Sequence, residues 1–215
     1  MSEKSKDATV IQTKETQAKI TPSDALKMLK EGNERFVKSV QLHRDLMKQA
    51  KETSKGQYPY AVILSCLDSR TSAEIIFDQG IGDVFSARVA GNIINDDIIG
   101  SLEFACKVTG SKLIVVLGHT DCGAVKSACD QVKLGNITTL LEKLDTAVSS
   151  AKSDGERNSK NKKFVQDVAD LNVKLGIQQI KDKSSILNEM INKGEIMIVG
   201  GMYNIETGKA EFFTE

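Results

Sequence analysis

The sequence predicts an α/β fold, in which a mainly parallel β-sheet is flanked by helices and carries an N-terminal helical arm. Three apolar runs, at residues 61–66, 112–119 and 196–204, have the composition of strands covered on both faces. Segments with helical spacing separate these runs, and such alternation is typical of parallel sheets with right-handed crossovers. We therefore expect ligands to bind beyond the carboxyl ends of the strands.

The bulk composition narrows the class of protein. The 215 residues suit one domain with a substantial core. The 29 acidic and 29 basic residues cancel, and Trp is absent, so neither a polyanionic nucleic acid nor a stacked single strand is indicated as a partner. No apolar run approaches the length of a membrane span, and no signal peptide is visible. We expect a cytoplasmic protein, or a periplasmic one if a signal peptide has been removed.

The elements of the first half follow from capping residues and apolar spacing. Residues 1–20 are polar and predict a flexible or partner-bound tail, which leaves a single domain at 21–215. The first helix begins at Thr21, with Pro22 at its first helical position. We expect this helix to reach about residue 40, followed by a helix at 41–54, a strand at 61–66, a short helix at 71–80, a strand at 84–90, and a helix that Asn95 caps and Gly110 ends.

The second half continues the alternation. Its expected elements are a strand at 112–119, helices at about 122–134 and 136–150, a polar loop at 151–163, helices around 165–175 and 186–191, a strand at 196–204, and an edge strand at 210–213.

Two of the expected strands end in metal-ligating side chains. Cys66 ends the first strand, and His119 ends the strand at 112–119, with Cys122 three residues later. Adjacent parallel strands would bring these ends together. Two thiolates and one imidazole favour zinc over magnesium or calcium, and three protein ligands leave the open position of a catalytic site. A lone buried cysteine is usually a core residue, but a His and a Cys leaving one strand have no packing reason to be paired.

The other cysteines and the second histidine have simpler interpretations. Cys106 and Cys129 fall on helices and are interpreted as structural thiols. His43 lies in a polar stretch and is interpreted as a surface residue. Four cysteines are too few for a disulfide scaffold, and the chain lacks the C-x-x-C spacing of a thiol redox protein.

Asp68 and Arg70 share one side of the extended segment with Cys66, because side chains alternate along such a segment. Arg70 can hold Asp68 through two hydrogen bonds and keep it ionised. A carboxylate held in this way can only accept, so beside a metal it can orient a bound hydroxide toward an electrophile. The alternative is a solvated ion pair on the surface, but the position next to a candidate ligand favours the catalytic interpretation.

The stretches CLDSR (66–70), ARVAGN (87–92) and HTDC (119–122) together resemble the β-class carbonic anhydrases, and the similarity covers nearly the whole chain from residue 21. The resemblance implies reversible hydration of carbon dioxide to bicarbonate and a proton, with one Zn²⁺ per subunit and a zinc-bound hydroxide that an Asp–Arg pair orients. Hydrolysis of carbonyl sulfide or carbon disulfide on the same scaffold is the nearest alternative. A zinc protein without catalytic activity would leave the Asp–Arg pair without a purpose.

The resemblance also implies roles for single residues. Cys66, His119 and Cys122 match the zinc ligands, and Asp68 and Arg70 match the catalytic pair. Asp68 is further expected as an occasional fourth zinc ligand in a closed form at low pH. Four positions are implied to contact the substrate, and they are Gln57, Phe85, Phe104 and Gly123.

The amphipathic helices before residue 55 carry more apolar positions than a lone arm can bury. The resemblance implies that they wrap a neighbouring subunit and that the pocket lies at the interface. We therefore expect a homodimer or a dimer of dimers, with carbon dioxide and bicarbonate as ligands and with no nucleic-acid or membrane partner.

Overall fold

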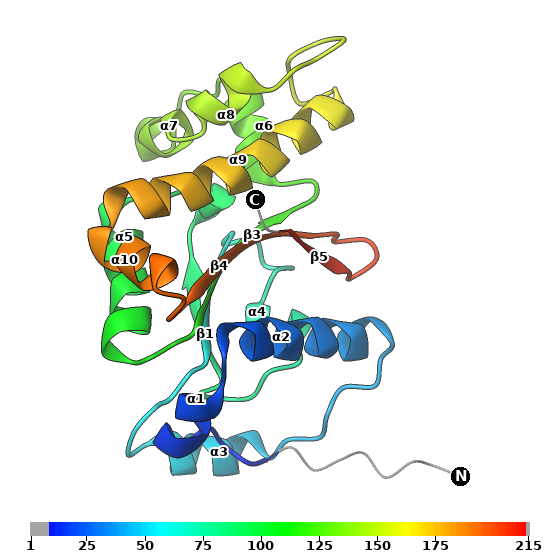
Figure 1. The fold of residues 1–215 in the computed structure, drawn as a ribbon. Coiled ribbons are helices and arrows are strands. Elements are labelled where there is room, and N and C mark those ends of the chain that lie inside the picture. The colour runs from blue at the N-terminus through cyan, green and yellow to red at the C-terminus, as the bar shows by residue number, and fades with distance from the viewer. Residues whose placement is uncertain (1–8, 214–215) are drawn as a thin grey trace.

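The protein is described here by a computed structural model over residues 9–213, which contains a five-stranded sheet flanked by helices (Figure 1). The strand order is β2-β1-β3-β4-β5. Four strands are parallel and β5 is antiparallel to β4. The strands are β1 (Ala61–Ser65), β2 (Val84–Arg88), β3 (Leu113–His119), β4 (Met197–Tyr203) and β5 (Ala210–Phe213). The α/β prediction is therefore confirmed.

The two central strands are buried on both faces, as their continuous apolar sequences predict. In β1, Val62 and Leu64 belong to one apolar cluster, whereas Ala61 and Ile63 belong to another on the opposite face. β1 pairs directly with β3, and Ser65 lies opposite Leu117. The carboxyl ends of these two strands therefore lie side by side at one edge of the sheet.

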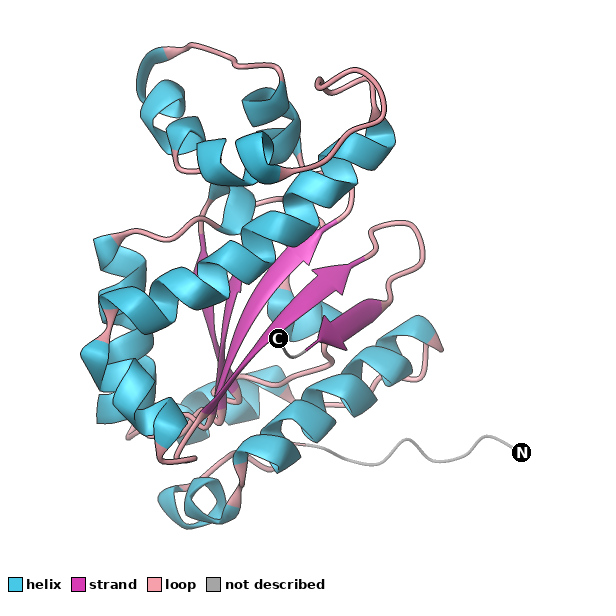
Figure 2. Cartoon of the chain, turned by 45° about the horizontal axis from the view of Figure 1, so that its top comes forward, coloured by secondary structure: helices cyan, strands magenta, loops and turns pink. Residues whose placement is uncertain are grey.

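Helices cover both faces of this sheet, in a three-layer arrangement that Figure 2 shows. The first face packs against α5 (Asp96–Glu103), α9 (Lys162–Lys183) and α10 (Ser185–Asn192). The second face packs against α2 (Pro22–Val37) and α4 (Ala73–Ile76). Beyond the carboxyl ends of the strands lie α6 (Gly123–Cys129), α7 (Gly135–Glu142) and α8 (Asp145–Ser150). No helix in the described part of the chain is long and apolar enough to cross a bilayer.

The N-terminal arm contains α1 (Lys14–Lys19), α2 and α3 (Leu46–Thr53). Thr21 caps α2, as the sequence predicts, and it does so in a reciprocal capping box with Asp24. Residues 1–8 of the expected tail lie outside the described residues. In the remainder, the buried side chain of Gln17 donates to the carbonyl oxygens of Pro59 and Thr109, at 2.8 and 2.9 Å. These contacts hold α1 against its own chain.

Several expected helices are shorter than their apolar patterns, because local hydrogen bonds compete with the helix. The expected helix 41–54 begins only at Leu46, where Asp45 caps it. The helix from Asn95 gives way to a π-helical turn, η2 (Phe104–Val108), where the Thr109 hydroxyl binds two carbonyl oxygens. The expected helix 136–150 is two helices, α7 and α8, with the fully buried Leu144 between them.

The expected helix 71–80 is reduced to α4, because Asp78 adopts a left-handed conformation with φ of 48°. Its carboxylate is 3 % exposed and accepts from Arg35 Nε and Arg44 Nη1, both at 2.5 Å, and from the Leu42 amide at 3.2 Å. This ion network links the loop before α3 to α2 and α4.

We expect Asp78→Asn to destabilise the protein by about 3–5 kcal/mol, because it leaves the guanidinium of Arg44, with its side chain 10 % exposed, without a buried counter-charge. Asparagine has nearly the same shape as aspartate and also tolerates a positive φ, so the change in stability reports the loss of the negative charge. Urea unfolding of the zinc-loaded protein measures the effect. The exposed Asp182→Asn is the control and should stay within about 0.5 kcal/mol of wild type; an equal effect in both variants would contradict the assignment.

Candidate metal centre

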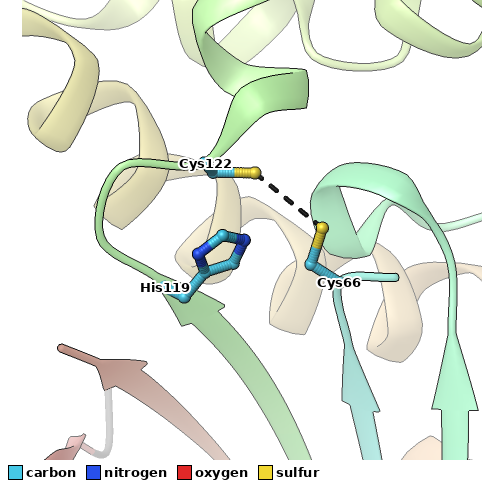
Figure 3. A group of neighbouring side chains, drawn as sticks. All are labelled: Cys66, His119 and Cys122. Atoms are coloured by element: carbon cyan, nitrogen blue, oxygen red, sulfur yellow. Dashed lines mark hydrogen bonds between the residues drawn. The ribbon is translucent and has the colours of Figure 1, made fainter. Parts of the chain in front are cut away.

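Three metal-ligating side chains converge at the carboxyl edge of the sheet (Figure 3). Cys66 directly follows β1, and His119 is the last residue of β3. The chain then turns through Asp121, which has a φ of 58°, so that Cys122 at the start of α6 faces back toward the strand ends. The convergence that the sequence predicts from two separate strands is therefore present.

The geometry fits a single zinc ion. The Sγ atoms of Cys66 and Cys122 are 3.9 Å apart. Two thiolates at about 2.3 Å from a tetrahedral zinc ion would be separated by about 3.8 Å. The ligand atoms of all three side chains lie within 4.8 Å of one another, and all three residues are buried. The donor set of two sulfurs and one nitrogen is one that zinc prefers.

The orientation of His119 supports the same assignment. Its Nδ1 lies 2.9 Å from the carbonyl oxygen of Thr120, which is a hydrogen-bond acceptor, so Nδ1 carries the proton. The other nitrogen, Nε2, is buried and has no hydrogen-bond partner among the described residues. A buried nitrogen with a free lone pair is the arrangement that a metal-ligating histidine adopts.

The two thiols influence each other strongly. The hydrogen bond with Cys122, together with the backbone amides of Asp68 and Gly91, lowers the pKa of Cys66 despite its burial. The same hydrogen bond, together with burial and the charge of the Cys66 thiolate, raises the pKa of Cys122. Cys66 is therefore the first of the two thiols to ionise, and coordination by both sulfurs requires the proton of Cys122 to leave as well.

The predicted pair of Asp68 and Arg70 is present beside the ligands. Arg70 donates to both carboxylate oxygens, from Nε at 2.9 Å and from Nη2 at 2.7 Å. These hydrogen bonds hold the pKa of Asp68 well below its usual range, so the group is an acceptor at any working pH. Oδ2 of Asp68 is 4.0 Å from Nε2 of His119. The carboxylate therefore stands next to the position that a shared metal ion would occupy.

Arg88 and Thr71 support this loop, and the sequence argument did not assign them. Arg88 donates to the carbonyl oxygens of Cys66 and Asp68, at 3.1 and 2.6 Å. The Thr71 hydroxyl donates to the same two oxygens, at 3.1 and 2.9 Å. The sequence does contain one indication of this role for Arg88, which is its position in ARVAGN at the end of the strand that neighbours β1.

The four residues expected to contact substrate do not gather in one place within the chain. Gly123 begins α6 next to Cys122, and a Cβ atom at this position would meet open space. Phe85 pairs with Val62, four residues or about 13 Å along the strand from Cys66. Phe104 lies 6.5 Å from Phe85 in an edge-to-face contact.

The cavity beside the two phenylalanines has a volume of about 560 Å³. Its walls come from β2, α5 and η2, and they include Phe85, Phe104 and Asp97 but none of the metal-ligating residues. Gln57 is exposed and precedes the opposite end of β1 from Cys66.

The other two cysteines are buried and the second histidine is exposed, as the sequence predicts. Cys106 and Cys129 are buried thiols outside the metal-ligating cluster. Burial raises the pKa of Cys106 to about 12 and that of Cys129 to about 11, so both stay protonated. His43 is exposed.

Comparison with known proteins agrees with the site. A family model described as carbonic anhydrase matches residues 61–210. "Carbonic anhydrase 2" of Mycobacterium tuberculosis is 37% identical over 195 residues, which cover 88% of this chain and 91% of that protein. The carbonic anhydrase of Mycolicibacterium smegmatis is 35% identical, with 88% and 92% covered.

Solved structures give the same result. The β-carbonic anhydrase CafA of Aspergillus fumigatus matches with a TM-score of 0.68 and 26% identity, over 89% of each chain. A tetrameric β-carbonic anhydrase of Sordaria macrospora matches with a TM-score of 0.66 and 25% identity, over 77% of this chain and 86% of that one. With its Cys–His–Cys cluster and these relatives, the chain belongs to the β-class carbonic anhydrase family.

Proposed function

We propose that this carbonic anhydrase uses Asp68 and Arg70 as its catalytic pair in the reversible hydration of carbon dioxide to bicarbonate and a proton. The observation that carries the assignment is the position of Asp68, whose Oδ2 is 4.0 Å from Nε2 of His119 while Arg70 holds both of its oxygens. A stopped-flow assay of the zinc-loaded protein with carbon dioxide, and with carbonyl sulfide in parallel, tests the reaction.

The roles of the residues follow from their hydrogen-bonding capacity. Zinc, held by Cys66, His119 and Cys122, would supply an activated water as the nucleophile. Asp68 is ionised and can only accept, so it would accept a hydrogen bond from the nucleophile and leave a lone pair of the nucleophile's oxygen directed at carbon dioxide. Arg70 restrains the carboxylate through two parallel hydrogen bonds. Gly123 is exposed beside Cys122, and its backbone N–H is assigned to a bicarbonate oxygen.

We expect the hydration rate to rise with pH into the alkaline range. Two thiolates cancel the charge of a divalent ion, so zinc here is a weaker Lewis acid than in the three-histidine carbonic anhydrase site, a known case in which the pKa of the bound water is about 7. Asp68 does not cause the rise, because Arg70 keeps its pKa low and it is already ionised in mildly acidic solution. Initial rates measured from mildly acidic to alkaline pH give the profile; a flat profile would contradict this explanation.

The substrate pocket is proposed to form between two copies of the chain. Phe85 and Phe104 line a cavity. Phe85 lies about 13 Å along the sheet from Cys66 of the same chain, so we assign the two rings to the metal site of a neighbouring chain. Gln57 is assigned to the same shared pocket. The outer edge of β2 is unpaired within the described chain, since β2 ends the sheet. Large apolar side chains are exposed near this strand, and they are Ile75 on α4, Ile81 before β2 and Phe104 against Phe85.

A homodimer, or a dimer of dimers like the tetrameric relative from Sordaria macrospora, is therefore the proposed assembly. Light scattering coupled to size exclusion measures the mass directly. We expect at least twice the chain mass of 23.4 kDa, and Phe104→Lys should shift the protein toward the monomer and lower its activity. An active monomer would contradict the shared pocket.

Three further expectations remain part of this proposal. Residues 21–215 are proposed to act as a single catalytic domain. Asp68 is proposed to reach the zinc ion in a closed form at low pH, since only a short movement separates it from the ligands. The reducing environment that two free metal-binding thiols need favours the cytoplasm.

A further inference from the structure

The turn after β2 contacts the zinc ligand Cys66 through its backbone. The amide N–H of Gly91 donates to Sγ of Cys66, at 3.3 Å. Gly91 belongs to η1 (Ala90–Asn92) and has φ of 67°, and the next residue, Asn92, has φ of 41°. Two successive left-handed residues are unusual, and this conformation is what directs the N–H at the sulfur.

A side chain at Gly91 would be crowded as well as strained. A Cβ atom on Gly91 would meet Ala124 Cβ and Leu144 Cδ1, both at 3.3 Å, in addition to the strain of the positive φ. Glycine has no Cβ atom, however, so its own φ and ψ angles are less restricted than those of any other residue. The direction of the Gly91 N–H therefore depends on the contacts that the rest of the protein makes with this turn.

A side chain from a helix distant in sequence binds the carbonyl oxygen of Gly91. Asn172, on α9 and 8 % exposed, donates from Nδ2 to the carbonyl oxygen of Gly91, at 2.9 Å. This contact joins residues 81 positions apart. The amide N–H of Gly91 is thus bound by the sulfur and its carbonyl by Asn172, so the two contacts fix the orientation of the turn together.

We propose that Asn172 is a positioning residue for the zinc ligand Cys66, acting through the Gly91 turn. An N–H donor to a zinc-bound sulfur withdraws electron density from it and holds it in place, and such outer contacts orient ligands and tune the metal. By binding the Gly91 carbonyl, Asn172 keeps the Gly91 N–H directed at the sulfur of Cys66. Loss of the side-chain amide leaves the turn free to move, so the sulfur loses its donor although every zinc ligand is still present.

Two substitutions test this role. Asn172→Leu keeps the number of side-chain heavy atoms and removes the donor, and Asn172→Ala is smaller and carries the same test if the leucine variant does not fold. Gln178→Ala is the matched control, because it removes an exposed amide from the same helix, where Gln178 donates to Asp182, at 2.7 Å.

The first readout is zinc transfer from the holoenzyme to the chelator 4-(2-pyridylazo)resorcinol. We expect transfer to be about 10-fold faster in the Asn172 variants than in wild type and unchanged in Gln178→Ala. An equal increase in the control variant would overturn the proposal, because the effect would then be a general one of weakening α9.

The second readout is the sulfur-to-cobalt charge-transfer band of the cobalt-substituted protein, which a purely structural role would not move. A sulfur that loses an N–H donor gives up electron density more easily, so we expect the band to move to longer wavelength in the Asn172 variants. A band at the wild-type position would overturn the proposal.

A measurement on the unaltered chain does not depend on any variant folding. In the ¹¹³Cd-substituted protein with ¹⁵N-glycine, a hydrogen bond from Gly91 to the sulfur transmits a scalar coupling between the amide proton and the metal. We expect this coupling at Gly91. Its absence, with the site fully loaded, would overturn the proposal.

Discussion

Asp68→Asn is expected to lower the rate of carbon dioxide hydration by about 100-fold or more while zinc stays bound. The amide is nearly the same size as the carboxylate, but it is neutral and can donate as well as accept. It can therefore no longer enforce one orientation of the nucleophile, and the pairing with Arg70 at 2.7 Å loses its charge. Stopped-flow hydration and metal analysis on the same sample give the two quantities.

The exposed Asp182→Asn is the matched control for this experiment, since it makes the same chemical change far from the sheet edge and should leave both quantities unchanged. A fully active Asp68→Asn enzyme would remove Asp68 from the mechanism. Loss of zinc together with loss of activity would instead assign Asp68 a part in holding the metal.

Cys122→Ser is expected to lose both bound zinc and activity. A serine hydroxyl stays protonated at neutral pH and is a poor zinc ligand, so only Cys66 and His119 would remain to hold the ion. Metal analysis after dialysis, followed by the hydration assay, measures the loss. We expect activity to fall to the background rate.

The control for Cys122→Ser comes from the same helix. Cys129 is also buried, but it is not part of the metal-ligating cluster, and burial raises its pKa to about 11. Cys129→Ser should therefore keep its zinc, although the buried hydroxyl lowers stability. Equal zinc loss in the two variants would mean that packing of α6, and not coordination by Cys122, retains the metal.

The sheet and the metal ligands could be predicted because their signals are local and chemically distinctive. A continuous apolar run such as residues 61–65 has few interpretations other than a strand covered on both faces. Parallel topology predicts that Cys66 and His119 meet if their strands are adjacent, and β1 and β3 are adjacent in the sheet. Asp68 could be paired with Arg70 from period-two spacing, and the two hydrogen bonds between them are present.

Helix boundaries were harder to predict, because they depend on side chains that bind the backbone from elsewhere. The left-handed conformation of Asp78 ends α4 early, and it is held by arginines 34 and 43 positions away in sequence. The helix α1 was not expected at all, since its apolar content is low; a capping box between Thr13 and Thr16 and the buried contacts of Gln17 stabilise it.

The surroundings of the metal centre carry no sequence signal of the same kind. Asn172 appears in the sequence as one polar residue in an amphipathic helix, and nothing in its spacing connects it to Gly91, 81 positions earlier. Arg88 appears as the polar end of a strand. The contact of Asn172 with Gly91 and the contacts of Arg88 with the Cys66 loop depend on how α9 and β2 pack, which local patterns do not specify.

The central claim is that Cys66, His119 and Cys122 bind one zinc ion and leave a fourth position open. X-ray absorption at the zinc edge, on the reduced, zinc-loaded protein at mildly alkaline pH, tests it directly. We predict two sulfur ligands at about 2.3 Å, one imidazole nitrogen at about 2.0–2.1 Å and one further light atom. A first shell without sulfur, or one filled by four protein ligands at that pH, would contradict the account.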